Sequence, residues 1–140
     1  MTVEKFLLRE GDIVINRVNS PPQLGKSAII PKLQEPVVFE SNMMRFRANE
    51  SVLIPSVIGV ALQLESVRRA LTRNAKHAIN QSSINQGDVM GIELPKPPVA
   101  LQASFAEQVQ RLETLTTNLA AAAAKAEAMA AALSAEVFWA

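Results

Sequence analysis

Two polar segments of the sequence, the first at residues 17–26 and the second at residues 73–85, carry the side chains that could do chemistry. Both are rich in Arg, Lys, Asn and Gln, the residue types that hold phosphates and hydrogen-bond to base edges. The candidate DNA contacts in them are Arg17, Asn19, Gln23, Lys26, Arg73, Lys76, His77, Gln81 and Asn85. Solvated loops have the same composition, so the pattern alone leaves DNA binding and an ordinary polar surface both open.

Three features imitate catalytic motifs, and each lacks a required part. The segment Ser20–Ser27 resembles a phosphate-binding loop, but Ser20 stands where the first Gly belongs, and a strand-like segment follows instead of a helix. Its first four residues, Ser-Pro-Pro-Gln, also resemble an adenine methyltransferase loop without the aromatic residue that stacks on a flipped base. His77 has no nucleophile or carboxylate at a fixed spacing, so contact with solvent or phosphate is the better expectation. We therefore expect no enzyme activity and no cofactor.

Composition narrows the class of protein further. The chain has 140 residues, of which 49% are apolar, so one domain with a core is expected. It has no Cys and one His, which excludes disulfides and argues against Cys- or His-based metal sites. Residues 1–98 hold 12 basic and 9 acidic side chains, whereas residues 99–140 hold 2 and 4. There is no signal peptide or bilayer-spanning apolar run, so we expect a cytoplasmic protein without a membrane partner.

The elements that must position the polar segments can be outlined from local patterns. Short β-branched or alternating runs predict strands at residues 12–16, 27–30, 36–40, 43–47 and 89–94. In the fourth run, Arg45 and Arg47 are expected on the solvent-facing side. Apolar residues at helical spacing after Pro55 predict one packed helix that ends near Arg73, and the amide-rich residues 74–88 predict a loop. The expected fold is α+β, with a small mixed β body in residues 1–94.

A proline-rich linker at residues 95–98 precedes an uninterrupted helical pattern over residues 99–138. Apolar residues recur there every seven positions, with a second row three positions later, which is typical of a coiled-coil seam. The expected dimer-interface residues are Phe105, Leu112, Leu115, Leu119, Ala122, Ala126, Met129 and Leu133. Because this stripe is too long for the body to cover, we expect a homodimer built from antiparallel helices.

Two groups of motifs stand in a fixed order along the chain. The first runs from Leu8 to Ser20 (LREGDIVINRVNS) and continues in Leu24–Ala28 (LGKSA). The second comprises Gln81–Asn85 (QSSIN), Leu94–Gln102 (LPKPPVALQ) and Phe105. In order and spacing they resemble the target-recognition domain and following spacer helix of the specificity subunits of type I restriction-modification systems. The family's domain starts some tens of residues before the Gly-Asp motif, so residues 1–94 are expected to form a partial domain.

The resemblance implies a non-catalytic role in sequence-specific DNA recognition. The domain would read one half of a bipartite target, and the long helix would pair with a second helix and set the distance between the halves. Double-stranded DNA and the modification and restriction subunits, which bind S-adenosylmethionine and ATP, would be the partners. The two polar segments would then lie beside one DNA-facing surface. The expected base or groove contacts on it are Arg17, Asn19, Gln81 and Asn85, and the expected phosphate contacts are Lys26, Arg73 and Lys76.

Two alternatives to this interpretation remain. Asn19 and Asn85 are residue types that also cap turns through their own side chains. The chain as a whole could be a structural or assembly protein that dimerises, or binds a modification subunit, through its helix without binding DNA.

Overall fold

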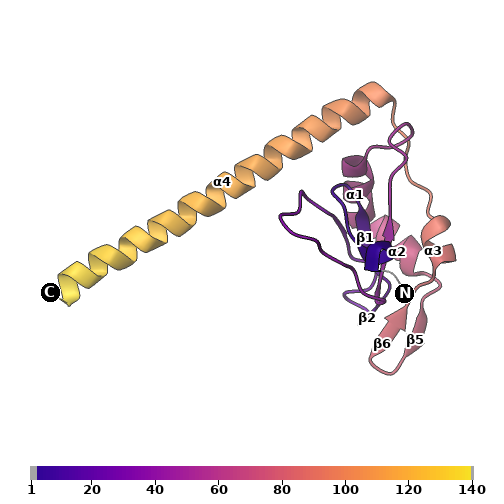
Figure 1. The fold of residues 1–140 in the computed structure, drawn as a ribbon, viewed down its shortest axis with the longest axis horizontal. Helices are drawn as coiled ribbons and strands as arrows, with labels where there is room; N and C mark the ends of the chain where they lie inside the picture. The colour runs from indigo at the N-terminus through magenta and orange to yellow at the C-terminus, as the bar shows by residue number, and fades with distance from the viewer. Residues whose placement is uncertain (1–2, 140) are drawn as a thin grey trace. The chain divides into compact units, whose positions relative to one another are not determined.

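A computed structural model describes residues 3–139 and divides the chain into two compact units, one ending at Ala103 and the other beginning at Ser104. The elements are, in order, η1 (Val3–Phe6), β1 (Ile13–Asn16), β2 (Val18–Asn19), β3 (Ser27–Ile29), β4 (Met43–Phe46), α1 (Pro55–Gln63), α2 (Glu65–Thr72), β5 (Lys76–Ala78), β6 (Gln81–Ser83), α3 (Gln86–Met90) and α4 (Val99–Phe138) (Figure 1). The fold is α+β, as the sequence predicts.

The first sheet has the order β3-β1-β4, and all its pairs are antiparallel. Ile13 and Ile15 of β1 are fully buried because alternate side chains of a strand point to one face. Helix α1 packs on β3, and Gly59 allows this approach: a Cβ there would collide with the Ile29 side chain. The strands predicted at 12–16, 27–30 and 43–47 are therefore confirmed.

The second sheet has the order β2-β6-β5 and corrects the loop predicted for residues 74–88. Strands β5 and β6 form a hairpin in which Ala78 is paired with Gln81, so Ile79 and Asn80 make the turn. Asn80 has a φ of 66°, a left-handed conformation that Asn tolerates better than most residues. Strand β2 pairs with β6 and thereby joins the two polar segments of the sequence.

Two helices stand where the sequence predicts one. Leu64 interrupts the pattern in extended conformation (φ −63°, ψ 134°), ending α1 and preceding α2. The two helices nevertheless share one core, because Leu62 and Leu71 are both buried in the cluster around Ile13 and Ile15. The prediction that the helical region ends near Arg73 is confirmed.

Two predicted strands are absent among the described residues. Residues 36–40 make only an isolated bridge, between Leu7 and Val38. Residues 89–90 belong to α3, and residues 92–94 form no regular structure. Helix α3 begins at a capping box in which the side chains of Asn85 and Asp88 each accept a hydrogen bond from the other's backbone N–H. These hydrogen bonds stabilise a helix start just before the short apolar run that predicts a strand.

Helix α4 runs without interruption over the predicted residues. Its first turn lies in the first unit, where Gln102 is only 2% exposed. The Gln102 amide donates to the carbonyls of Val52 (3.0 Å) and Pro97 (2.8 Å) and accepts from the N–H of Ile54 (3.0 Å). None of the described helices combines the length and apolar character needed to cross a membrane.

Candidate nucleic-acid interface

The Gly-Asp motif anchors the start of β1. Gly11 has a φ of 81°, and the carboxylate of the fully buried Asp12 accepts from the Arg9 N–H (2.9 Å) and from Arg47 Nε (2.5 Å). Arg45 Nη1 lies 3.8 Å from the same carboxylate. Burial alone would raise the pKa of Asp12, but these hydrogen bonds and positive charges outweigh it and hold that pKa below its usual value.

This ion-pair network corrects the expectation of a solvent-facing side chain for Arg45 but not for Arg47, which is exposed. Arg45 is half-buried and also donates to the Leu7 carbonyl (2.7 Å), while Arg47 keeps half of its side chain exposed. The hydrogen bond to Asp12 raises the pKa of Arg47. Both arginines therefore serve to hold β4 and the chain before β1 together.

The first polar segment closes on itself beside β1. The Asn16 N–H donates to the Lys26 carbonyl (2.9 Å), and the Gly25 N–H donates to the Asn16 carbonyl (2.9 Å). Gly25 has a φ of 73° and lies against α2, where a Cβ would approach Leu71 to 3.1 Å. Only Gly suits this position, which fixes the backbone from which the exposed Lys26 side chain extends.

One row of side chains crosses the second sheet from the first polar segment to the second. Asn19 is paired with Ser82, and Ser82 with His77. Opposed residues of antiparallel strands share a face, and His77 Nδ1 is hydrogen-bonded to the buried Ser82 Oγ at 2.7 Å. The Asn19 side chain also accepts from the Ser20 N–H (2.8 Å), as the turn-capping alternative requires.

Lys76 and Gln81 lie on the opposite face of this sheet, because side chains alternate along each strand. Both are exposed. The structure therefore divides the candidate contacts of the hairpin between two faces, with His77 and Asn19 on one and Lys76 and Gln81 on the other.

Arg17 links the two sheets through its backbone. Its N–H donates to the Asn42 carbonyl (2.9 Å), and its carbonyl accepts from the Ile84 N–H (2.9 Å). Within the described residues its side-chain Nε is buried without a hydrogen-bond partner. A buried donor of this kind is uncommon in folded proteins.

A shallow pocket of about 350 Å³ lies beside the first polar segment. Lys26, Ser27, Gln63 and Arg68 line it together with Leu62. The Arg68 Nη2 donates weakly to the Pro22 carbonyl (3.4 Å), so α2 and the loop before β3 place two cations at one opening. Sequence reasoning missed Arg68 because it stands in a helix that was expected only to pack. Gln23 lies in the same loop and is exposed.

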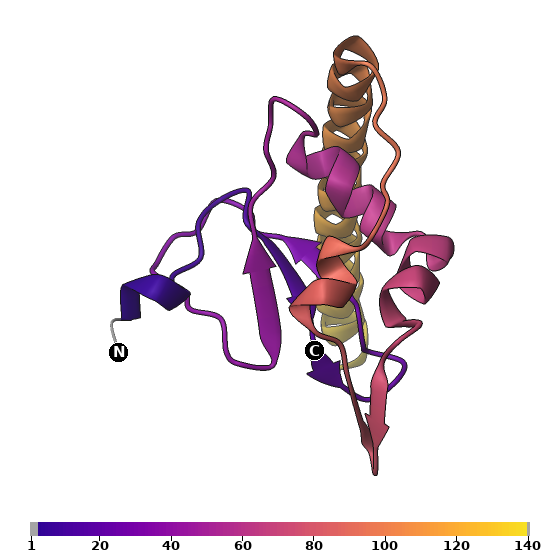
Figure 2. The same cartoon turned by 90° about the vertical axis from the view of Figure 1, so that its right-hand side faces the viewer.

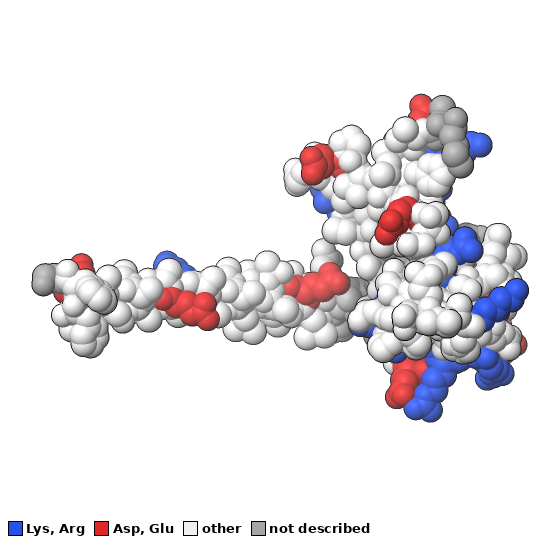
Figure 3. Space-filling model, turned by 90° about the horizontal axis from the view of Figure 1, so that it is seen from below, with Lys and Arg blue, Asp and Glu red and all other residues white. Residues whose placement is uncertain are grey.

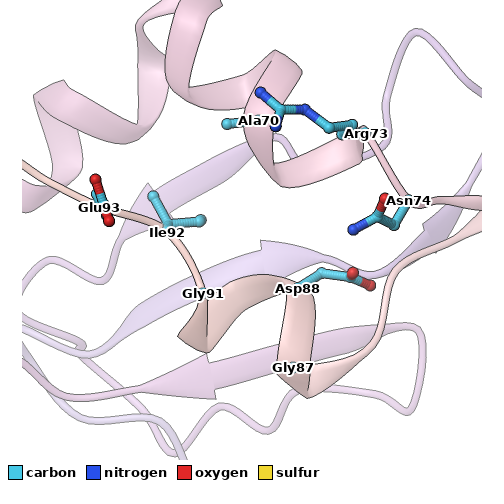
Figure 4. A pocket seen from close by; sticks show the side chains of 8 residues that line it. All are labelled: Ala70, Arg73, Asn74, Gly87, Asp88, Gly91, Ile92 and Glu93. Carbon is cyan, nitrogen blue, oxygen red and sulfur yellow. The ribbon is translucent and has the colours of Figure 1, made fainter.

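A second pocket, of about 450 Å³, separates the end of α2 from α3 (Figure 4). Arg73 and Asn74 lie on one side, and Asp88 and Glu93 also line the opening. Because two carboxylates line the same pocket as Arg73, the pocket as a whole is not suited to binding a phosphate. Asn85 caps α3 with its side chain, accepting from the Asp88 N–H (3.1 Å). Among residues 3–139, no three His, Asp or Glu side chains gather as metal ligands would.

The charge around these residues is uneven. From Ser66 to Gly87 the sequence contains Arg68, Arg69, Arg73 and Lys76 but no carboxylate. Arg69 pairs with Glu65 one turn earlier in α2. Figure 3 looks at the end of the body from which the hairpin extends, and Lys and Arg side chains gather there. This end of the body is suited to a polyanion.

The apolar seam of α4 is open in the single chain. Exposed fractions are 63% for Leu112, 57% for Leu115, 70% for Leu119 and 58% for Met129. The other predicted interface residues, also exposed, are Phe105, Ala122, Ala126 and Leu133. A contiguous stripe of this length is rarely left in water.

The chain is similar to a curated protein of Methanocaldococcus jannaschii named "Putative type I restriction enzyme MjaX specificity subunit". The two sequences are 29% identical over 113 residues, which cover 81% of this chain. The chain spans only about a quarter of that relative's length, since the match covers 27% of it. No model of a known protein family matches the chain. The similarity supports the family that the motifs indicate, the specificity subunits of type I restriction enzymes.

Proposed function

We propose that this chain is a non-catalytic DNA-recognition component of a type I restriction-modification complex. Its first unit reads one half of a bipartite target, and its partners are double-stranded DNA and the modification and restriction subunits, which carry the chemistry. The observation that carries the proposal is the β2–β6 pairing, which joins the two polar segments in one sheet beside a carboxylate-free stretch of chain. The named relative supports the same role.

Within this role we assign different tasks to the exposed cations and to the amides. Lys26 and Lys76 contact phosphates, as does Arg73 through the part of its side chain outside the mixed pocket. Arg17, Asn19, Gln81 and Asn85 contact bases or a groove. His77 lies on the face of the second sheet that carries Asn19, opposite Lys76 and Gln81, and Gln23 lies exposed in the first polar segment.

The second part of the proposal concerns α4. Its open seam pairs antiparallel with the same helix of a second copy and sets the distance between two half-sites. A helix of 40 residues is about 60 Å long at ~1.5 Å per residue. A two-fold dimer implies a palindromic split target, because the symmetry of the protein is repeated in its site.

Binding of random-sequence duplex across a salt series tests the DNA-binding part. The full chain is assembled with the modification subunit, and affinity is followed by fluorescence anisotropy. Lys26→Ala or Lys76→Ala is expected to weaken binding to every duplex and to reduce the slope of log affinity against log salt by about one unit. Lys32→Ala, an exposed lysine in the loop between β3 and β4, is the matched control and is expected to change neither.

Two outcomes contradict the proposal. Absence of salt-dependent affinity in the assembled wild type rules out DNA recognition and favours an assembly protein that works through α4 alone. Equal effects of Lys32→Ala and Lys76→Ala show that the lysine effects are not local to the proposed surface.

A further inference from the structure

The tip of the β5–β6 hairpin carries one large apolar side chain that the body does not use. Ile79 is 94% exposed, more than any other described large apolar residue. The turn is formed by the backbone, since Ala78 pairs with Gln81 and Asn80 takes the left-handed conformation. In both ribbon views the tip extends past α2 and α3, with no other segment of residues 3–103 beside it (Figure 2).

The chain leading into this tip has a charge that would hold a polyanion. Arg73 ends α2, and all three side chains of β5, including Lys76 and His77, are exposed. No carboxylate occurs between Ser66 and Gly87. If the apolar tip bound a protein partner, it would need no such excess of cations. If it enters DNA, it must pass between two rows of phosphates, which the cations would hold.

We propose that the hairpin tip enters the minor groove of duplex DNA and that the Ile79 side chain wedges between two stacked base pairs. The proposal rests on the DNA-recognition function above and deepens it. The minor groove is only about 6 Å wide, so a two-residue turn suits it better than the broad face of the sheet. Ile is among the apolar side chains that unstack base steps there and bend the duplex toward the major groove.

This wedge gives the hairpin a specificity of its own. Pyrimidine–purine steps unstack most easily, so Ile79 favours such a step at a fixed place in the half-site without hydrogen-bonding to any base. Lys76 and Arg73, which come before the tip in the chain, hold the phosphates on the rim of the groove.

The test uses the full chain with its modification subunit and a duplex selected by the wild type from a random pool. The two duplex ends carry a donor and an acceptor dye, so that the bend is read as energy transfer. Ile79→Ala is expected to weaken binding about ten- to hundredfold and to reduce the bend. The salt slope is expected to stay unchanged, because no charge is removed. Ile79→Leu is expected to retain both affinity and bend.

Val99→Ala is the matched control, since Val99 is a 72%-exposed aliphatic residue away from the basic segment. Truncating Ile79 removes no core contact, so circular dichroism of the variant is expected to match the wild type. Wild-type affinity and bend in Ile79→Ala refute the wedge but leave the DNA-recognition function standing. If Ile79→Ala no longer binds the modification subunit but leaves the bend unchanged, the wedge is also refuted, and the tip is instead a contact to that subunit. A wild type that selects no duplex refutes both proposals.

Discussion

Replacing Asp12 by Asn tests whether a buried carboxylate holds the first sheet together. Asn has the same shape and keeps an acceptor for the Arg9 N–H, but it loses the charge that faces Arg47 at 2.5 Å and Arg45 at 3.8 Å. A hydrogen bond to a charged group contributes about 1.5–3 kcal/mol. Because half of the Arg47 side chain is exposed and can rehydrate, we expect Asp12→Asn to destabilise the body by the lower part of that range, about 1.5–2 kcal/mol at pH 7.

The pH dependence of stability has a definite sign. The pKa of Asp12 is lowered in the folded chain, so its contribution is present above the unfolded pKa of about 3.9 and is lost as the pH falls through the folded value. The stability difference between wild type and Asp12→Asn should therefore shrink on acidification below pH 4. Glu10→Gln, which changes an exposed carboxylate two residues earlier, is the control and should show no such difference.

Hydrogen exchange of the β1 amides is the suitable assay, because circular dichroism of the whole chain is dominated by α4. Slower exchange in wild type than in Asp12→Asn at pH 7, with a difference that shrinks as the pH falls below 4, is the expected result. If Asp12→Asn protects β1 as well as wild type does at pH 7, the ion-pair network contributes nothing and the reasoning is refuted.

Three further changes probe other parts of the chain. Gln102→Ala should cost about 1–3 kcal/mol and speed exchange of the Ile54 amide, which loses its acceptor; an unchanged exchange rate would speak against this role. Gly59→Ala should destabilise the body by about 1 kcal/mol in urea unfolding, since overpacking outweighs the gain in helix propensity, and Ile29→Val should restore part of the loss; a more stable single variant would contradict the close packing. Leu112→Glu should turn the proposed dimer into a monomer in sedimentation equilibrium, and a monomeric wild type would remove the basis of the dimer.

The sequence predicts elements well where one local signal dominates. The short β-branched run at residues 12–16, the alternation in residues 43–47 and the unbroken helical pattern of residues 99–138 appear in the structure as β1, β4 and α4. Prediction from the sequence fails where the local pattern is weak or where the structure depends on tertiary contacts. Leu64 breaks the predicted helix without a Gly or Pro, and residues 36–40 find a single bridge partner instead of a neighbouring strand. Helix α3 could have been found, since Asn85 and Asp88 have capping-box spacing.

The candidate site is only partly readable from residue types. The two polar segments were recognisable by composition, but their union through β2 and β6 depends on a two-residue pairing that has no sequence signal. Polar residues in β5 and β6 concealed the hairpin, because neither strand buries an apolar face that would produce alternation. For the same reason the sequence does not single out Ile79. Only the strand register shows that His77 and Lys76 lie on opposite faces of the sheet.

The way the hairpin is attached has a consequence for how such a protein can change over generations. Its attachment depends on two inward-facing residues, Ser82 and Ile84, each 2% exposed, and on the short pairing with β2. Residues 76–81 all expose their side chains. Substitutions in this exposed stretch leave the core undisturbed, whereas substitutions at the buried Ser82 or Ile84 are expected to destabilise it. The molecule thus keeps variation at the hairpin tip apart from the stability of the core, and under the proposed wedge a single substitution at Ile79 is enough to change the binding preference.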